Sequence, residues 1–109
     1  MSAQQVDLDV LARVGLALAD DSRRRLLVAL IDGPCYPAEL ADTLVMTRAN
    51  VSNHLACLRG CGLVVAEQEG RRVRYEIADA RLGSVLRDLS TIVVAADPAL
   101  CPTGEEGCC

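Results

Sequence analysis

The sequence predicts a mainly α-helical domain that carries one small β-hairpin. Apolar residues recur every three or four positions along most of the chain, which is the period of an amphipathic helix. Two short predicted helices, residues 37–44 and 47–62, are joined by a tight turn, as in a helix-turn-helix. Residues 63–77 then alternate between apolar and polar, which predicts a hairpin that follows as a wing. We therefore predict a winged helix-turn-helix over residues 1–97 and a flexible, cysteine-containing tail over residues 98–109.

The charge of the chain is acidic overall but locally basic. The 109 residues carry a net charge of −4, and all 11 cations are arginine. Nucleic-acid binders are usually basic, yet residues 45–75 hold five arginines against two glutamates, a local charge of +3. Because salt screens charges beyond about 10 Å, DNA would meet this local excess. The sequence shows no basic-then-apolar leader and no apolar run long enough to span a membrane, so we expect a cytoplasmic protein without a membrane partner.

Three helices are predicted before the helix that would read DNA. Residues 7–19 place leucine and glycine along one helical stripe. Residues 20–22, Asp-Asp-Ser, supply caps and early negative charge for a second helix over residues 23–31, which the Gly-Pro pair at 33–34 ends. The third helix covers residues 37–44, and its first residue is a proline, which suits a first helical turn.

Residues 47–62 predict a recognition helix. Thr47 can cap its start, because the side-chain oxygen accepts a backbone N–H that the first turn leaves unpaired. Val51, Leu55 and Leu58 form one apolar stripe, which we expect to face the core. The other side offers polar groups that suit base edges and phosphates, so we predict DNA contacts from Arg48, Asn50, Ser52, Asn53 and His54.

The predicted wing consists of strands over residues 63–68 and 72–77, joined by a tip at residues 69–71. Along the second strand the apolar residues face one way and the charged residues face the other. The exposed arginines of a wing can reach DNA phosphates, so we predict contacts from Arg71, Arg72 and Arg74.

A long last helix is predicted from Asp79, which can cap it, to about Ala96. Its apolar residues recur at threes and fours over the whole length, and one small core cannot cover a stripe of that length. Pairing of this helix with its own copy and with the first helix would cover it. We therefore predict a homodimer with two-fold symmetry.

Six cysteines in a reducing compartment favour metal binding or redox chemistry over a disulfide framework. Cys57 and Cys61 lie one turn apart on one side of the recognition helix, offset from its apolar stripe. Free cysteine is often only a small core residue, but this offset favours two metal ligands. Two thiolates are too few for a tight site, and thiolates select soft ions. Cys35, after a Gly-Pro pair, is expected to pack rather than to bind metal.

These features resemble the ArsR/SmtB family of winged-helix, metal-responsive repressors, and most of all its cadmium/lead-sensing members. The resemblance covers about residues 8–96 and rests on the motifs LALADDSRRRLLVAL, VSNHLACLRGCGLV and GRRVRYEIAD. It implies a homodimer that binds operator DNA without metal and releases it when metal binds. Two departures stand out: Tyr36 and Ala38 occupy the usual Cys-x-Cys metal motif, and Val45 replaces a common glycine in the turn.

The resemblance also implies that Cys101 supplies a third thiolate and that the sensed ion is Cd(II) or Pb(II), with Zn(II) and As(III) as alternatives. Cys108 and Cys109 are expected either to form a second site, to add to the first, or to be reactive thiols in a tail, and such a pair also suits As(III). His54 could bind metal, but family members carry a histidine there without using it in this way.

Two other function classes compete with the metal sensor. A repressor whose thiols are oxidised would use the same cysteines. A thiol enzyme would need a Cys-x-x-Cys or a cysteine with a base nearby. The chain has no Cys-x-x-Cys, and its one histidine lies on the recognition helix, so we expect no enzyme.

Overall fold

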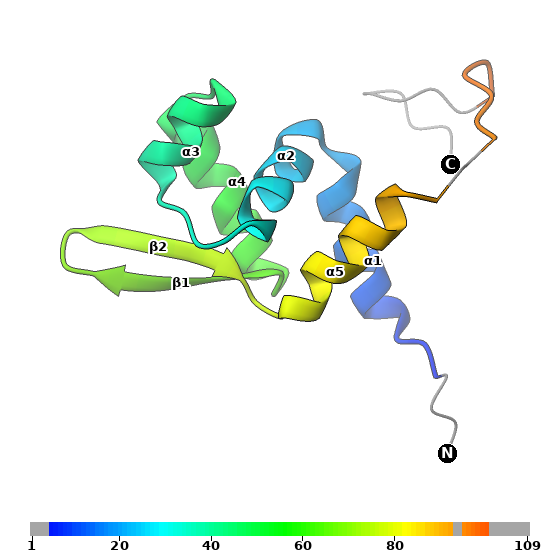
Figure 1. Cartoon of the computed structure of the whole chain (residues 1–109), viewed down its shortest axis with the longest axis horizontal. Coiled ribbons are helices and arrows are strands. Elements are labelled where there is room, and N and C mark those ends of the chain that lie inside the picture. Colours follow the sequence, from blue (N-terminus) through cyan, green and yellow to red (C-terminus); the bar gives the residue numbers. More distant parts are fainter. Residues whose placement is uncertain (1–4, 93–94, 101–109) are drawn as a thin grey trace.

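A computed structural model describes residues 5–92 and 95–100. Within these residues, five helices and one antiparallel hairpin follow each other in the predicted order (Figure 1). Their bounds are α1 Leu8–Ala19, α2 Asp21–Ile31, α3 Pro37–Leu44, α4 Arg48–Gly60, β1 Val64–Glu69, β2 Arg72–Ile77 and α5 Ala80–Ser90. The predicted winged helix-turn-helix is therefore confirmed, with α3 and α4 as its helix pair and the hairpin as its wing.

The helix starts follow the predicted caps. The Asp7 carboxylate accepts hydrogen bonds from two backbone N–H groups at the start of α1, at 3.0 and 3.3 Å. The Asp20 carboxylate accepts one from the N–H of Arg23, at 2.9 Å. Because Asp20 is the cap, α2 begins at Asp21, two residues earlier than predicted. Asp21 thus belongs to the helix rather than to its cap.

The turn between α3 and α4 contains a strained residue. Val45 adopts the left-handed conformation, with φ 55° and ψ 57°. A β-branched side chain is rare in this region, because its Cβ atom crowds the following carbonyl oxygen. The backbone N–H of Met46 closes the turn on the carbonyl of Ala41, at 2.9 Å, and the Arg25 guanidinium donates to the carbonyl of Leu44, at 2.9 Å. The side chain of Val45 is 89% exposed, so burial does not compensate for the strain.

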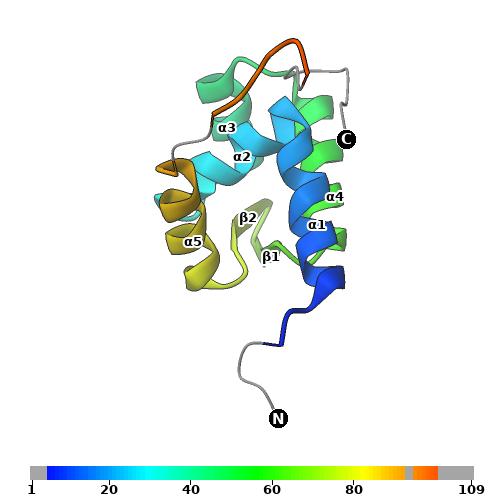
Figure 2. The same cartoon turned by 90° about the vertical axis from the view of Figure 1, so that its right-hand side faces the viewer.

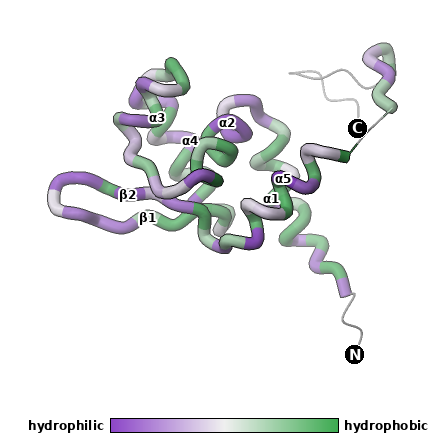
Figure 3. Tube along the Cα trace, in the orientation of Figure 1, coloured by the Kyte–Doolittle hydropathy of each residue, from purple (hydrophilic) through white to green (hydrophobic). Residues whose placement is uncertain are grey.

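The core is aliphatic, as a sequence without phenylalanine or tryptophan requires. Its centre lies where α2 and α4 meet, and the predicted stripe of α4 is fully buried there. Figure 3 shows the hydropathy of the chain changing from mainly hydrophobic in α1 to mainly hydrophilic in the hairpin. The largest fully buried side chains are Leu26, Leu27, Leu30, Leu40, Val51, Leu55, Leu58 and Val64.

The wing is bonded to the loop that precedes α3. In the hairpin, Val64 pairs with Ile77 and Glu69 pairs with Arg72. Cys35 and Tyr75 then exchange two backbone hydrogen bonds of 2.9 Å, so the α2–α3 loop forms an isolated bridge on the free edge of β2. Backbone hydrogen bonds of this kind fix relative position. The wing and the start of α3 therefore form one continuous unit.

The predicted extent of α5 is wrong, because the helix ends at Ser90 rather than near Ala96. The hydroxyls of Ser90 and Thr91 donate to the carbonyls of Arg87 and Asp88, each at 2.7 Å. Such side-chain bonds compete with continuation of a helix, and the β-branched run Thr-Ile-Val-Val at residues 91–94 also disfavours it. The predicted tail lies outside the described residues except for positions 98–100, which form a turn.

The end of the molecule opposite the wing exposes apolar side chains. Figure 2, which looks onto this end, shows α1 and α5 on its two sides, apart from each other. Leu8 is 73% exposed and Val85 is 55% exposed, although each lies on a predicted apolar stripe. In α1 only Ala17 is fully buried. No helix in the described part of the chain has the length and apolarity needed to cross a bilayer.

Candidate DNA interface and thiol site

Helix α4 presents a polar face because its apolar face is held in the core. The Thr47 hydroxyl accepts a hydrogen bond from the N–H of Asn50, at 3.1 Å, which confirms the predicted cap. With Val51, Leu55 and Leu58 fully buried, the remaining residues of the helix must point outward. The predicted DNA-contacting residues that are exposed on this helix are Arg48, Asn50, Ser52 and Asn53.

His54 differs from these four residues because it is only half-exposed and lies toward the start of α2. The pKa of Asp20 is lowered, first by its hydrogen bond from the Arg23 N–H and then by attraction to Arg23 and His54. His54 is therefore close enough to the cap of α2 to interact with it electrostatically.

Arg74, one of the predicted phosphate contacts, is surrounded by carboxylates of the wing itself. Its guanidinium forms ion pairs with Glu67, with Glu69 at 3.4 Å and with Glu76 at 3.7 Å. The pKa of Arg74 is raised, chiefly by attraction to Glu69. The positive charge of Arg74 is thus already neutralised inside the wing, so it is poorly placed to bind a phosphate.

Arg72 has a different environment from Arg74, although both lie on the same face of β2. Its guanidinium carbon lies 3.4 Å from the centroid of the Tyr36 ring, a stacked cation–π arrangement. One of its nitrogens lies 3.7 Å from a Glu39 carboxylate oxygen, and both side chains of this pair are more than half exposed. The Tyr36 hydroxyl donates a 2.6 Å hydrogen bond to Glu69, which raises the pKa of Tyr36.

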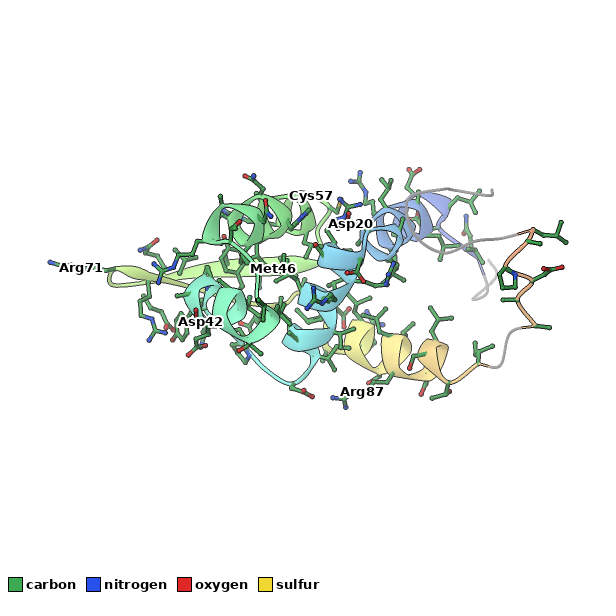
Figure 4. All side chains as sticks on the ribbon, turned by 90° about the horizontal axis from the view of Figure 1, so that it is seen from above. Asp20, Asp42, Met46, Cys57, Arg71 and Arg87 are labelled. Atoms are coloured by element: carbon green, nitrogen blue, oxygen red, sulfur yellow. The ribbon has the colours of Figure 1, made fainter. Side chains whose placement is uncertain are left out.

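A notch of about 300 Å³ lies between α3, α4 and the wing. Arg71, the residue after the tip glycine, borders it and extends from the far end of the hairpin (Figure 4). Three arginines border this hollow, and the first turn of α3 lies beside them with its positive dipole end. The notch is therefore a basic concave surface beside the predicted DNA-facing residues. Its lining includes Tyr36, Ala38, Arg48, Ser52, Arg71 and Arg72.

The sequence predicted a site role for Arg72, but it indicated neither the stacking of Tyr36 on Arg72 nor the neutralisation of Arg74. The second of these could have been found, because the hairpin register that alternation predicts places Glu67 directly opposite Arg74. The first depends on the α2–α3 loop folding back onto the wing, and no local pattern in the sequence indicates that contact.

The two predicted thiol ligands of α4 have unequal exposure. Cys57 is exposed, whereas Cys61 is half-buried, packs against the core and follows the last residue of the helix. The N–H of Cys61 donates to the carbonyl of Cys57, at 3.0 Å, so the two residues are one turn apart as predicted. In Figure 4, Cys57 lies on the same edge of the molecule as Asp20.

The remaining cysteines do not complete this site within the described residues. No three potential ligands among His, Cys, Asp and Glu come together within residues 5–92 and 95–100. Cys101, Cys108 and Cys109 lie outside those ranges. Cys35 is half-buried in the loop that bridges to the wing, and burial raises the pKa of its thiol, which fits the expected packing role. An exposed thiol and a second thiol one helical turn away can supply two ligands of a soft-metal site. Such a site needs further donor atoms.

Comparison with known proteins agrees with the winged helix-turn-helix fold. Residues 20–65 match the model of bacterial regulatory proteins of the arsR family. The chain is 62% identical over 87 residues to the HTH-type transcriptional regulator CmtR of Mycobacterium tuberculosis, covering 80% of this chain and 74% of that protein. Matching residues therefore extend well beyond the helix-turn-helix, through the wing and into the flanking helices.

Two solved structures share the fold. The NMR structure of the cadmium metal-sensor CmtR from Mycobacterium tuberculosis has 62% identity and a TM-score of 0.65, over 79% of this chain and 90% of that one. A homodimeric winged helix-turn-helix DNA-binding domain from Mycobacterium bovis has 35% identity and a TM-score of 0.68, over 82% of this chain and 90% of that one. This chain therefore belongs to the arsR family of bacterial regulatory proteins, and its function is regulation of transcription rather than catalysis.

Proposed function

We propose that this chain is a cytoplasmic, homodimeric repressor that binds operator DNA without metal and releases it on capturing Cd(II) or Pb(II). The observation that carries the proposal is the position of Cys57, which is an exposed thiol on the helix that also presents the polar DNA-facing residues. A metal bound by this thiol would act directly on the orientation of α4.

The ligand set would consist of thiolates from Cys57, Cys61 and Cys101, with Cys101 supplied by the predicted tail, residues 98–109, of either subunit. Sulfur ligands favour soft ions over Mg²⁺, Ca²⁺ or Mn²⁺. The similar Mycobacterium tuberculosis protein is a cadmium metal-sensor, which supports Cd(II). Zn(II) is the lesser alternative, and As(III) becomes the better one if Cys108 and Cys109 take part.

Release of DNA would follow from a change in helix orientation. Cys61 terminates α4 and Cys57 lies one turn before it, so an ion that joins both to the tail would restrain the carboxyl end of the helix. A dimer must hold its two recognition helices at the spacing of two half-sites. A coupling free energy of about 1–3 kcal/mol would weaken DNA binding roughly 5- to 150-fold.

The dimer would form through α1 and α5. Both helices expose apolar residues on the same end of the molecule, and an apolar surface of this kind marks a protein interface. A two-fold arrangement would cover this surface and leave both α4 helices outside it. The homodimeric relative with 35% identity supports this assembly.

The test uses the full chain, reduced, and a duplex selected from a random-sequence pool as its operator. Titration with Cd(II), Pb(II), Zn(II) and As(III), followed by sulfur-to-metal absorption and DNA release, should show release by the first two ions. Cys57→Ser and Cys61→Ser should abolish release but keep DNA binding, while Cys35→Ser, the matched control, should behave like the unchanged protein. Metal-induced release that persists in both α4 variants would overturn the site.

A redox signal is the second candidate function, favoured by the exposure of Cys57. An accessible thiol can be oxidised and can then react with a second thiol nearby. Release of the operator by peroxide, together with retention in the presence of stoichiometric metal and reductant, would support this candidate over the metal sensor.

A further inference from the structure

We infer that the notch between α3, α4 and the wing receives one backbone phosphate of DNA, and that Tyr36 is the positioning residue that holds Arg72 there. This inference rests on the proposed function as a DNA-binding repressor. It assigns a role to a tyrosine outside both the helix-turn-helix pair and the wing. It also separates two arginines that the sequence pattern treats as equivalent.

The first step is the availability of Arg72. A guanidinium that stacks on an aromatic face keeps the N–H groups at its edge free to donate, and a guanidinium edge matches phosphate oxygens. The nearest carboxylate, on Glu39, lies 3.7 Å away in an exposed pair, which contributes little in water. An incoming phosphate can therefore replace Glu39 as the partner of Arg72.

The second step is the charge around the notch. Arg48 reaches it from α4 and Arg71 from the wing tip, so a phosphate there would face positive charge from two elements besides Arg72. Arg74 differs from Arg72, because three glutamates of the wing already neutralise its charge. Of the two arginines on this face of β2, the geometry assigns DNA contact to Arg72 and wing stability to Arg74.

The third step is the rigidity of Tyr36. Its hydroxyl is held by Glu69 at 2.6 Å and its backbone N–H by the Glu39 carboxylate at 3.3 Å. The preceding residue, Cys35, is bonded to Tyr75 of the wing through two backbone hydrogen bonds. The ring is thus fixed before DNA arrives, and a partner fixed in advance loses less entropy on binding.

The experiment measures the affinity of the full-length metal-free protein for its selected duplex as a function of salt concentration. Each lost phosphate contact makes the plot of log K against log salt less steep by about 0.9. A change that removes one contact per subunit should therefore make the plot for the dimer less steep by roughly twice that amount. We expect this loss for Arg72→Gln and no comparable loss for Arg74→Gln. Tyr36→Leu, which removes the ring face, should approach the slope of Arg72→Gln. Tyr36→Phe keeps the ring face and loses only the hydroxyl bond to Glu69, so its slope should lie between that of Arg72→Gln and that of the unchanged protein.

A scan with neutral methylphosphonates locates the contact. Substitution at one phosphate position in each half-site should weaken DNA binding by the unchanged protein. The same substitution should cause little further loss of affinity in Arg72→Gln or Tyr36→Leu. A merely structural role of Tyr36 would weaken binding equally at every substituted phosphate. Circular dichroism and sedimentation of each variant check that fold and assembly are kept.

Failure of this inference is distinct from failure of the proposed function. If the unchanged protein selects no duplex at all, DNA binding itself is wrong. A second outcome is that the protein binds a duplex, while Arg72→Gln keeps the full slope and no phosphate couples to Arg72. The phosphate site in the notch is then wrong, and the proposed repressor function is unaffected. Equal slope losses for Arg72→Gln and Arg74→Gln would also contradict the notch.

Discussion

At the wing end of the molecule the apolar stripe of α4 is buried, and the surface carries arginine, asparagine and serine. At the opposite end α1 and α5, placed in Figure 1, expose leucine and valine. Apart from Val45 and Val65, the wing end therefore buries its large apolar side chains within a single chain and presents polar groups outward. The other end leaves apolar surface for a second copy to cover. The contrast separates where the chain would contact DNA from where it would contact itself.

The largest expected effect comes from placing a charge in the apolar end. Leu89→Asp on α5, where the side chain is 49% exposed, should leave the monomer folded but prevent the dimer, because a buried unpaired carboxylate is costly. Loss of the second half-site contact should weaken operator binding by about 100-fold or more. Sedimentation and DNA titration measure both effects. Val65→Asp, on β1 of the wing and 45% exposed, is the control that should remain dimeric.

The strained turn at the wing end gives the next effect. Val45→Gly should stabilise the fold by about 0.5–1 kcal/mol, because glycine removes a left-handed penalty of roughly 1–2 kcal/mol and adds a smaller entropy cost in the unfolded chain. Val28→Gly, at an exposed position inside α2, should instead destabilise the fold. Urea unfolding at one fixed protein concentration measures both. Equal destabilisation by the two changes would contradict the strain argument.

A smaller effect concerns the acidic side chain beside the notch. Glu39→Gln keeps an oxygen for the Tyr36 N–H but removes the charge that pairs with Arg72, so operator affinity should rise a few-fold, in line with the small energy of an exposed ion pair. Asp42→Asn removes the same charge one turn further along α3 and should change affinity less (Figure 4). Competition titrations with the selected duplex compare the two.

The smallest effect is the pH dependence contributed by Asp79, the cap of α5. Hydrogen bonds from the Arg81 side chain and backbone lower the pKa of Asp79 to about 2 from 3.8. A carboxyl group whose pKa is lower in the folded state stabilises the fold at pH values above its unfolded pKa. This contribution to the free energy of unfolding is lost as the pH falls from about 4 to about 2. Asp79→Asn should flatten this part of the stability profile. Asp88→Asn, on the same helix, is the charge-matched control in acid titrations followed by circular dichroism.

The two ends also differ in how far the sequence predicts them. Caps such as Asp20 and Thr47 and the stripe of α4 are local patterns, and the structure confirms them. The end of α5 was mispredicted because apolar periodicity continues past Ser90, while hydroxyl-to-carbonyl bonds end the helix there.

The surface of the wing end was only half predictable. Alternation along β2 shows which residues face outward, but not that Arg74 meets three glutamates while Arg72 meets Tyr36. The last contact joins residues 36 apart in the chain through a loop, which no periodic pattern encodes. The predicted metal ligands Cys101, Cys108 and Cys109 lie outside the described residues, so the complete ligand set stays a prediction.

The bridge between Cys35 and Tyr75 matters for anyone who builds chimeric regulators from this scaffold. A hairpin exchanged alone, cut at its two strand ends, would lose the backbone bonds that the α2–α3 loop supplies. Residues 33–36 should therefore be transplanted with the hairpin as one cassette. Insertions in that loop would shift the grafted hairpin relative to the rest of the scaffold.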